Sequence, residues 1–172
     1  MSHQSQLDFV KSVKDMFPYS FKDAKVLEVG SLNINGTVRV FFEQCDYTGV
    51  DLSEGKDVDI VGRIHLLPLM PNSFDTVISC ECFEHDKHWK ETFAQMYNIA
   101  RGLVIFSCAT TGRPEHGTTA TSPADSPFTN DYYRNLTEED FRKEFDFDAM
   151  FSKYQFSTCG RPEDLYFWGL KK

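Results

Sequence analysis

The feature that most constrains this chain is a short apolar run that ends in a carboxylate and a glycine, Val26-Leu-Glu-Val-Gly30. A second short run, Tyr47-Thr-Gly-Val-Asp51, ends in a carboxylate 21 residues after that glycine. Two such runs are typical of a βαβ unit that binds a nucleoside. The glycine lets the backbone approach the ligand, and the second carboxylate can accept hydrogen bonds from ribose hydroxyls.

The loop after the first run reads Gly30-Ser-Leu-Asn-Ile-Asn-Gly36 and lacks the Gly-x-Gly-x-x-Gly spacing of dinucleotide sites. A pyrophosphate site is therefore poorly supported, and a nucleoside without phosphates fits better. Because Asn tolerates left-handed backbone, Asn33 or Asn35 is expected to supply the turn that the missing glycines would otherwise make.

Length and charge narrow the class of protein. The 172 residues predict a single domain over 1–172. The net charge is −8 and no run of Lys or Arg exceeds two residues, so neither a nucleic-acid backbone nor an anionic membrane is expected as the partner. A nucleic-acid base presented with local contacts stays open. Five Cys without a Cys-x-x-Cys pair indicate reduced thiols and a cytoplasmic location, and no apolar stretch reaches ~18 residues.

Strand-like and helix-like segments alternate along the first two thirds of the chain. This alternation predicts an α/β fold, a three-layer Rossmann-like sandwich with a mostly parallel seven-stranded sheet. The last two strands, joined by a link containing Arg161 and Pro162, are expected to form an antiparallel hairpin at the edge. Strands are predicted over 25–29, 47–50, 57–61, 74–80, 102–108, 150–157 and 165–170, and helices over 5–16, 36–42, 87–100 and 137–145.

Between the last parallel strand and the last helix, residues 110–135 are rich in Gly, Pro, Ser and Thr and show no clear period. A loop of this length in a compact domain is usually functional or mobile. The helix after it begins with Thr137-Glu-Glu-Asp140, a pattern that resembles a capping box.

Further motifs follow the βαβ unit in a fixed order: Gly62-Arg-Ile-His-Leu-Leu-Pro68, Ser73-Phe-Asp-Thr-Val-Ile-Ser79, Glu81-Cys-Phe-Glu-His85 and Asp131-Tyr-Tyr-Arg-Asn-Leu-Thr137. With Val26–Gly30 and Asp51, they resemble the class I S-adenosylmethionine-dependent methyltransferases, in the branch called methyltransferase type 11 domains. The match runs over about residues 25–108, half of the chain. No single motif is specific, but their order and spacing together are strong.

The resemblance implies that S-adenosylmethionine is the cofactor. Asp51 looks like the residue that binds the ribose, and Glu28 like the one that orients the loop and approaches the amino group of the methionine moiety. Residues 62–68 look like the segment that lines adenine. The residues implied at the cofactor are Glu28, Gly30, Ser31, Asp51, Leu52, Ile64, His65, Cys80 and Glu81.

One residue departs from the family pattern at the adenine end. Arg63 stands where many members carry an Asp that accepts from the adenine amino group, and Arg has no acceptor. Adenine is therefore expected to be held by backbone groups around Ile64 and His65, or otherwise.

Two histidines are candidates for a general base, which would help if the acceptor is a hydroxyl. His85 follows the fourth strand at the carboxyl edge of the sheet, and His116 in the long loop is second. A structural hydrogen bond near the cofactor is an equal interpretation of His85. Tyr132, Tyr133 and Arg134 are expected to line the acceptor pocket; a surface salt bridge is the alternative for Arg134.

A metal site is a further interpretation of the residues around His85. Glu81, His85 and His88 fall at i, i+4 and i+7 with Glu84 adjacent, and on one helix face three of these side chains could ligate a divalent ion. The segment straddles a turn, however, so no metal is predicted.

The sequence thus predicts an enzyme of EC 2.1.1 type that transfers methyl groups to a small-molecule acceptor, such as a sugar or another hydroxyl-bearing metabolite. The alternative is a non-catalytic nucleoside-binding or regulatory protein on the same fold. A nicotinamide dehydrogenase is weaker, because the chain has neither Gly-x-Gly-x-x-Gly nor Tyr-x-x-x-Lys. Oligomeric state and the methylated atom stay open.

Overall fold

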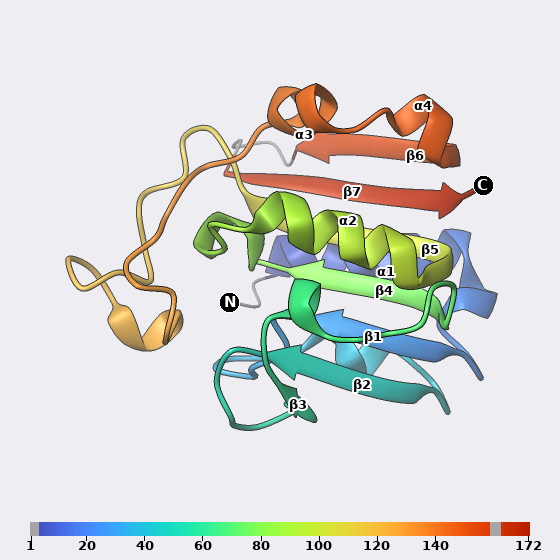
Figure 1. Ribbon diagram of the computed structural model, residues 1–172, viewed down its shortest axis with the longest axis horizontal. Helices are drawn as coiled ribbons and strands as arrows, with labels where there is room; N and C mark the ends of the chain where they lie inside the picture. Colours follow the sequence, from blue (N-terminus) through green and yellow to red (C-terminus); the bar gives the residue numbers. More distant parts are fainter. Residues whose placement is uncertain (1–3, 159–162) are drawn as a thin grey trace.

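The computed structural model describes residues 4–158 and 163–172, which contain one seven-stranded sheet in the order β3-β2-β1-β4-β5-β7-β6 (Figure 1). The first five strands pair in parallel, and β7 is antiparallel to both β5 and β6. The predicted fold class is therefore confirmed; Arg161 and Pro162 lie outside the described residues. The strands are β1 Lys25–Val29, β2 Asp46–Asp51, β3 Ile60–Val61, β4 Phe74–Cys80, β5 Ala100–Ala109, β6 Phe151–Thr158 and β7 Asp164–Lys171.

Helices cover both faces of this sheet and make the three layers. On one face, α1 (Gln4–Met16) buries Val10 and Val13 against side chains of β1, β4 and β5. On the other face, α2 (Trp89–Ile99) buries Phe93 and Met96 within the larger apolar cluster. In Figure 1, α2 lies in front of the sheet and α1 behind it. Because β1 and β4 are covered on both faces, consecutive residues along each strand are buried.

The helix predicted over 36–42 is wrong: this crossover contains a single 3-10 turn, Val38–Phe41. The segment begins at Gly36, and its Val residues are β-branched, so it has little intrinsic tendency to form an α-helix. Thr37 starts the turn, since its side chain accepts from the backbone N–H of Arg39 at 3.1 Å. The face that this helix would have covered is covered by α1 instead.

Two other boundaries differ from the prediction. The strand expected over 57–61 is reduced to β3, because Asp57 has φ +67° and so cannot continue an extended strand. A short helix that was not predicted, α4 (Phe147–Met150), follows α3 (Glu138–Glu144). The Asp146 side chain caps α4 by accepting from the backbone N–H of Ala149 at 3.0 Å.

The capping box before α3 is confirmed. Thr137 accepts from the Asp140 backbone at 3.3 Å, and the Asp140 carboxylate accepts from the Thr137 backbone at 2.9 Å. Phe141 of α3 stacks on Phe106 of β5 with ring centroids 4.6 Å apart. The long loop over 110–135 is thereby anchored at its far end, and it extends beyond the carboxyl edge of the parallel strands, at the left of Figure 1.

Candidate functional site

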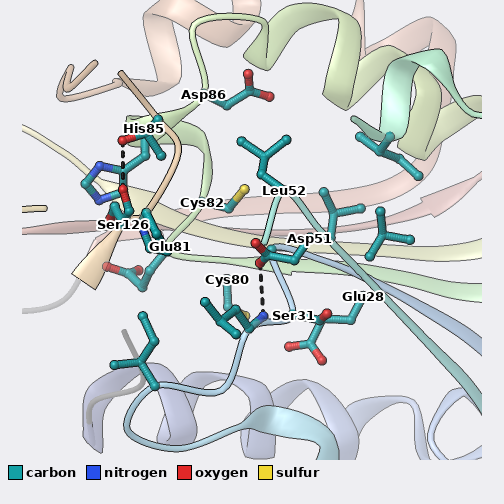
Figure 2. Close-up of a pocket in the computed structure, with 18 of the residues that line it drawn as sticks. Glu28, Ser31, Asp51, Leu52, Cys80, Glu81, Cys82, His85, Asp86 and Ser126 are labelled. Carbon is teal, nitrogen blue, oxygen red and sulfur yellow. Dashed lines mark hydrogen bonds between the residues drawn. The ribbon is translucent and has the colours of Figure 1, made fainter. Parts of the chain in front are cut away.

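A pocket opens where the carboxyl ends of β1, β2 and β4 meet, at the edge of the sheet where open α/β folds bind ligands (Figure 2). Its empty space amounts to about 1030 Å³, counted with its opening to solvent. The structure brings all nine residues predicted at the cofactor to the wall of this pocket: Glu28, Gly30, Ser31, Asp51, Leu52, Ile64, His65, Cys80 and Glu81.

Asp51 ends β2 with its carboxylate at the pocket. One carboxylate oxygen accepts from the backbone N–H of Leu32 at 3.0 Å, and the other accepts from that of Ser53 at 3.1 Å. Each carboxylate oxygen has two lone pairs, so each retains an acceptor position beyond its backbone partner. The carboxylate is therefore fixed in orientation and can still accept from two neighbouring hydroxyls of a ligand.

Gly30 makes the sharp turn after β1. It has φ +77°, and a Cβ atom there would lie 2.8 Å from the Cβ of Cys82. Gly30 and Ser31 both donate their backbone N–H groups to Val50 O, at 2.9 and 3.2 Å. Only glycine satisfies both the left-handed backbone and the close approach of Cys82 without strain. The turn after β1 therefore requires glycine at position 30.

The expected left-handed Asn residues are not found: neither Asn33 nor Asn35 has a positive φ, whereas Gly36 has φ +137°. Asn33 shapes the loop through its side chain instead. Its amide oxygen accepts from the Gly36 backbone at 2.9 Å, and its amide nitrogen donates to Asp57 at 2.6 Å. A local side-chain hydrogen bond thus replaces the missing glycines.

Glu28 is buried at the pocket floor. Its carboxylate accepts from the Tyr47 hydroxyl at 2.9 Å, and the Arg39 guanidinium lies 4.4 Å from the centre of the Tyr47 ring. Burial raises the pKa of Glu28 to about 7, against the lowering effects of the Tyr47 hydrogen bond and the Arg39 charge. The side chain therefore changes charge near neutral pH.

Glu28 is expected to make stability depend on pH. Between its ordinary pKa of 4.5 and about 7, the folded protein binds more protons here than the unfolded chain, so stability falls as pH rises through this range. The full loss corresponds to about 3 kcal/mol. The variant Glu28→Gln should be more stable than the wild type by about this amount at pH 8, and nearly equal to it below pH 4.5.

Urea denaturation of wild type and variant at both pH values measures this difference. The exposed Glu54 offers a matched control, because Glu54→Gln should change stability by the same small amount at either pH. An equal stability difference between Glu28→Gln and wild type at both pH values would contradict the buried, protonated carboxyl.

At the adenine end predicted from the sequence, Arg63 lines the pocket beside Ile64 and His65. His65 Nδ1 is buried and has no hydrogen-bond partner among the described residues. A carboxylate that the sequence interpretation missed, that of Asp86, lines the same pocket. It accepts from the backbone of His88 and the hydroxyl of Thr92, and its two oxygens retain further acceptor positions.

Other pocket residues missed from the sequence come from distant segments. Gln6 of α1 is buried; its Nε2 lies 3.5 Å from the Ser107 hydroxyl, and its Oε1 has no hydrogen-bond partner within the described part of the chain. The available signal was its position, because Gln6, Val10 and Val13 share one helix face, where only Gln6 is polar. The long loop adds Asp125, Ser126, Pro127 and Thr129.

The predicted acceptor-side residues do not all reach the pocket. His85 lines it, while His116 packs behind His85 with ring centroids 4.9 Å apart. Tyr133 contacts both rings, at 5.4 and 5.0 Å, but Tyr132 and Arg134 are not among the lining residues. The Arg134 guanidinium pairs with the Asp140 carboxylate, so its predicted alternative, a surface salt bridge, is what the structure contains.

Burial governs the charge of this region. It lowers the pKa of His85 to about 3, with the His116 charge as a further cause. Burial also raises the pKa of Glu84 to about 8, helped by the neighbouring Glu81 carboxylate. A histidine that is neutral at pH 7 and so weakly basic fits a hydrogen-bonding or ligating role better than the role of general base.

The helical face on which the metal alternative depended is not formed. Phe83–His85 is one 3-10 turn, and His88 packs on His65, with ring centroids 5.0 Å apart, instead of approaching His85.

Comparisons with known proteins agree with this geometry. The sequence profile of the family described as "Methyltransferase domain" matches residues 27–106. No curated protein sequence gives a significant match. Within the described residues, no helix is both long and apolar enough to cross a membrane.

Several solved structures share the fold at low sequence identity. Phosphoethanolamine N-methyltransferase 2 of Haemonchus contortus, in complex with S-adenosyl-L-methionine, has a TM-score of 0.67 and 16% identity, and the match covers 95% of this chain and 52% of that one. Magnesium protoporphyrin IX methyltransferase of Synechocystis PCC 6803, with S-adenosylmethionine bound, has a TM-score of 0.64 and 14% identity. That match covers 96% of this chain and 79% of the Synechocystis chain. The 1,6-didemethyltoxoflavin-N1-methyltransferase of Burkholderia thailandensis, with S-adenosylhomocysteine bound, has a TM-score of 0.64 and 16% identity. That match covers 98% of this chain and 80% of the B. thailandensis chain.

These matches confirm the predicted resemblance to class I S-adenosylmethionine-dependent methyltransferases, and the H. contortus and Synechocystis structures both contain S-adenosylmethionine. This chain spans about half the length of the H. contortus enzyme, so that protein has substantial parts without a counterpart here.

Proposed function

We propose that this chain, which has the class I methyltransferase fold and a match to its family over residues 27–106, transfers a methyl group from S-adenosylmethionine to a small-molecule acceptor. The observation that carries the proposal is the convergence of the nine predicted cofactor residues on one pocket at the carboxyl edge of the sheet. A chance match of motifs would have no reason to place residues from four separate segments around one cavity.

The polar groups of the pocket suit the parts of this cofactor. Asp51 offers two oriented carboxylate oxygens for ribose hydroxyls, and Gly30 lets the backbone pass close to the ligand. Glu28 would attract the α-ammonium group, and the unpartnered Gln6 Oε1 offers a further acceptor. Asp86 supplies a side-chain acceptor at the adenine end that Arg63 cannot provide.

When bound, S-adenosylmethionine supplies a methyl group on a positively charged sulfur that is ready for in-line displacement. The protein then has to keep the acceptor at attack distance and exclude water. His85 and Ser126 line the side of the pocket that the long loop covers, which is where we place the acceptor. The rings of Tyr133 and His116 both pack against the His85 ring and against each other.

The acceptor is proposed to be a hydroxyl-bearing small molecule, such as a sugar. The neighbouring enzymes are named for small-molecule acceptors of varied chemistry: phosphoethanolamine, magnesium protoporphyrin IX and 1,6-didemethyltoxoflavin. The net charge of −8 disfavours a nucleic-acid backbone as the acceptor. A cytoplasmic location belongs to the same proposal, motivated by the free thiols of Cys45, Cys80, Cys82 and Cys108.

A second function is favoured by a specific observation. Arg63 and the glycine-poor loop leave fewer contacts than usual for the nucleoside, and such a pocket would also suit a non-catalytic nucleoside-binding or regulatory protein. Isothermal titration with S-adenosylmethionine and S-adenosylhomocysteine tests both functions. Release of S-adenosylhomocysteine during incubation with a panel of hydroxyl, amine and carbon acceptors then separates them.

We expect both ligands to bind, and one acceptor class to yield S-adenosylhomocysteine. Binding without turnover on any acceptor would favour the regulatory protein. Failure of both ligands to bind at millimolar concentration would exclude both functions.

A further inference from the structure

Glu84 is a buried acidic side chain that has no role in the proposed methyl transfer. Its side chain is 0% exposed, and neither oxygen accepts a hydrogen bond from the described residues. The Nε2 of His116 lies 3.9 Å from Glu84 Oε1, too far for a hydrogen bond. Glu81, three residues earlier, adds a second buried carboxylate to this region. Such groups are costly in a protein interior unless a cation or a proton compensates them.

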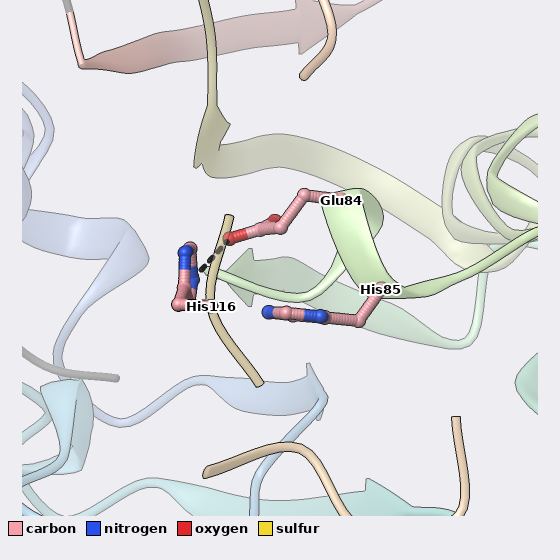
Figure 3. Close-up of side chains that lie close together, drawn as sticks. All are labelled: Glu84, His85 and His116. Atoms are coloured by element: carbon pink, nitrogen blue, oxygen red, sulfur yellow. Dashed lines mark ion pairs between the residues drawn. The ribbon is translucent and has the colours of Figure 1, made fainter. Parts of the chain in front are cut away.

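One nitrogen of the His85 imidazole and one of the His116 imidazole lie within 4.8 Å of each other and of a Glu84 carboxylate oxygen. The Nδ1 of His116 lies 3.1 Å from the backbone oxygen of Pro114, to which it can donate, and this leaves the Nε2 lone pair directed at Glu84. The Nδ1 of His85 is buried and has no hydrogen-bond partner in the described structure. Figure 3 shows the Glu84 carboxylate and the two rings converging, with His116 contributed by the long loop.

The loop is fitted closely to this cluster. Gly117 has φ +68°, and a Cβ atom there would lie 2.7 Å from Cε1 of His85. Tyr133 packs on both imidazole rings and donates its hydroxyl to Asn135 at 2.7 Å. The three side chains therefore belong to one built site, although His116 comes 31 positions after His85 in the sequence.

We propose that Glu84, His85 and His116 bind a first-row divalent transition-metal ion. One ligand atom from each residue lies within 4.8 Å of the others. Around an ion with bonds of about 2.1 Å, neighbouring ligands are about 3–3.5 Å apart, so the widest separation in the cluster has to shorten by about 1.3–1.8 Å to complete the site. Two imidazoles and one carboxylate favour Mn²⁺, Fe²⁺, Co²⁺ or Zn²⁺ over Mg²⁺ and Ca²⁺, which prefer oxygen ligands.

The ion would have a role at the acceptor, and this part rests on the proposed function. His85 lines both the cluster and the cofactor pocket, so an open coordination position would face the acceptor. A hydroxyl oxygen bound there would lose its proton more readily, and that proton would pass to solvent. As the oxygen forms its bond to the methyl carbon, the carbon–sulfur bond breaks and its electron pair stays on sulfur. The acceptor class is therefore a molecule with a hydroxyl that can ligate a metal, such as a vicinal diol.

The test titrates the full chain, first freed of metal with a chelator, with CoCl₂ and ZnCl₂ by calorimetry, and records the visible absorption of bound Co²⁺. We expect one ion per chain, with weaker binding of MgCl₂. Glu84→Gln and His116→Ala should each weaken Co²⁺ binding by about 10-fold or more and change the absorption bands. The matched control is His88→Ala, because His88 lies outside both the cluster and the pocket wall.

Binding of S-adenosylhomocysteine and thermal unfolding check that each variant is folded. No binding of Co²⁺ or Zn²⁺ by the wild type, or equal binding by His116→Ala and the wild type, would overturn the metal site. Metal binding without S-adenosylhomocysteine binding would support the site and contradict the proposed function. Binding of S-adenosylhomocysteine without metal binding would exclude the metal site and remain consistent with the proposed function.

Discussion

Replacing Asp51 with Asn is expected to raise the dissociation constant for S-adenosylhomocysteine by about 100-fold. The carboxylate is oriented by the backbone N–H groups of Leu32 and Ser53, and under the proposed function its remaining lone pairs accept from both ribose hydroxyls. A hydrogen bond to a charged group contributes about 1.5–3 kcal/mol, and Asn removes the charge and one of the two oxygens. A combined loss of about 3 kcal/mol corresponds to about 100-fold in affinity.

Isothermal titration measures this change, and Asp46→Asn is the matched control. Asp46 begins the same strand at its opposite, exposed end, so the same substitution there should leave affinity unchanged. Because Asp51 also contacts the loop, thermal unfolding of each variant must accompany the titration. A folded Asp51→Asn protein with wild-type affinity would exclude Asp51 as the ribose ligand.

Replacing Gly30 with Ala is expected to lower the free energy of unfolding by about 3 kcal/mol and to abolish measurable cofactor binding. The φ of +77° costs a residue with a Cβ about 1–2 kcal/mol. The new methyl group would also lie 2.8 Å from the Cβ of Cys82, and relieving such overpacking costs about 1–3 kcal/mol. Any shift of the turn would move the first loop of the pocket.

Chemical denaturation measures the loss, with Gly62→Ala as the comparison. Gly62 also lines the pocket, but its φ is not in the left-handed region, and a Cβ atom there would meet only the flexible end of Leu67, at 3.3 Å. The Gly62 variant should lose far less stability. Equal losses in both variants would mean that the left-handed turn is not the cause.

The parts of the fold that were predictable are those in which burial leaves a short segment rich in apolar residues. The strand over 74–80 was predicted at the bounds that the structure has, and the helix predicted over 87–100 is α2. The crossover at 36–42 failed because its apolar residues are spaced as in a helix, although they are β-branched and follow a glycine. Spacing alone does not separate a helix from a short turn that buries Val38.

The candidate site also has parts that were predictable from the sequence and parts that were not. Motifs at the ends of strands were predictable because parallel strands all end at the same edge of the sheet. This holds for any conformation of the loops. Gln6, Asp86 and the approach of His116 to Glu84 depend on how α1, a turn and the long loop fold back over that edge. None of these contacts has a local sequence period, so only the three-dimensional arrangement brings them together.

The sheet order has a consequence for how the polypeptide folds during synthesis. β6 joins the sheet only through β7, which lies between β5 and β6 although it comes last of the three in the sequence. During synthesis β6 leaves the ribosome before its future partner does. Its Phe151 and Phe156 must therefore await β7, and until then the nascent chain presents an unpaired, aromatic segment of the kind that chaperones bind.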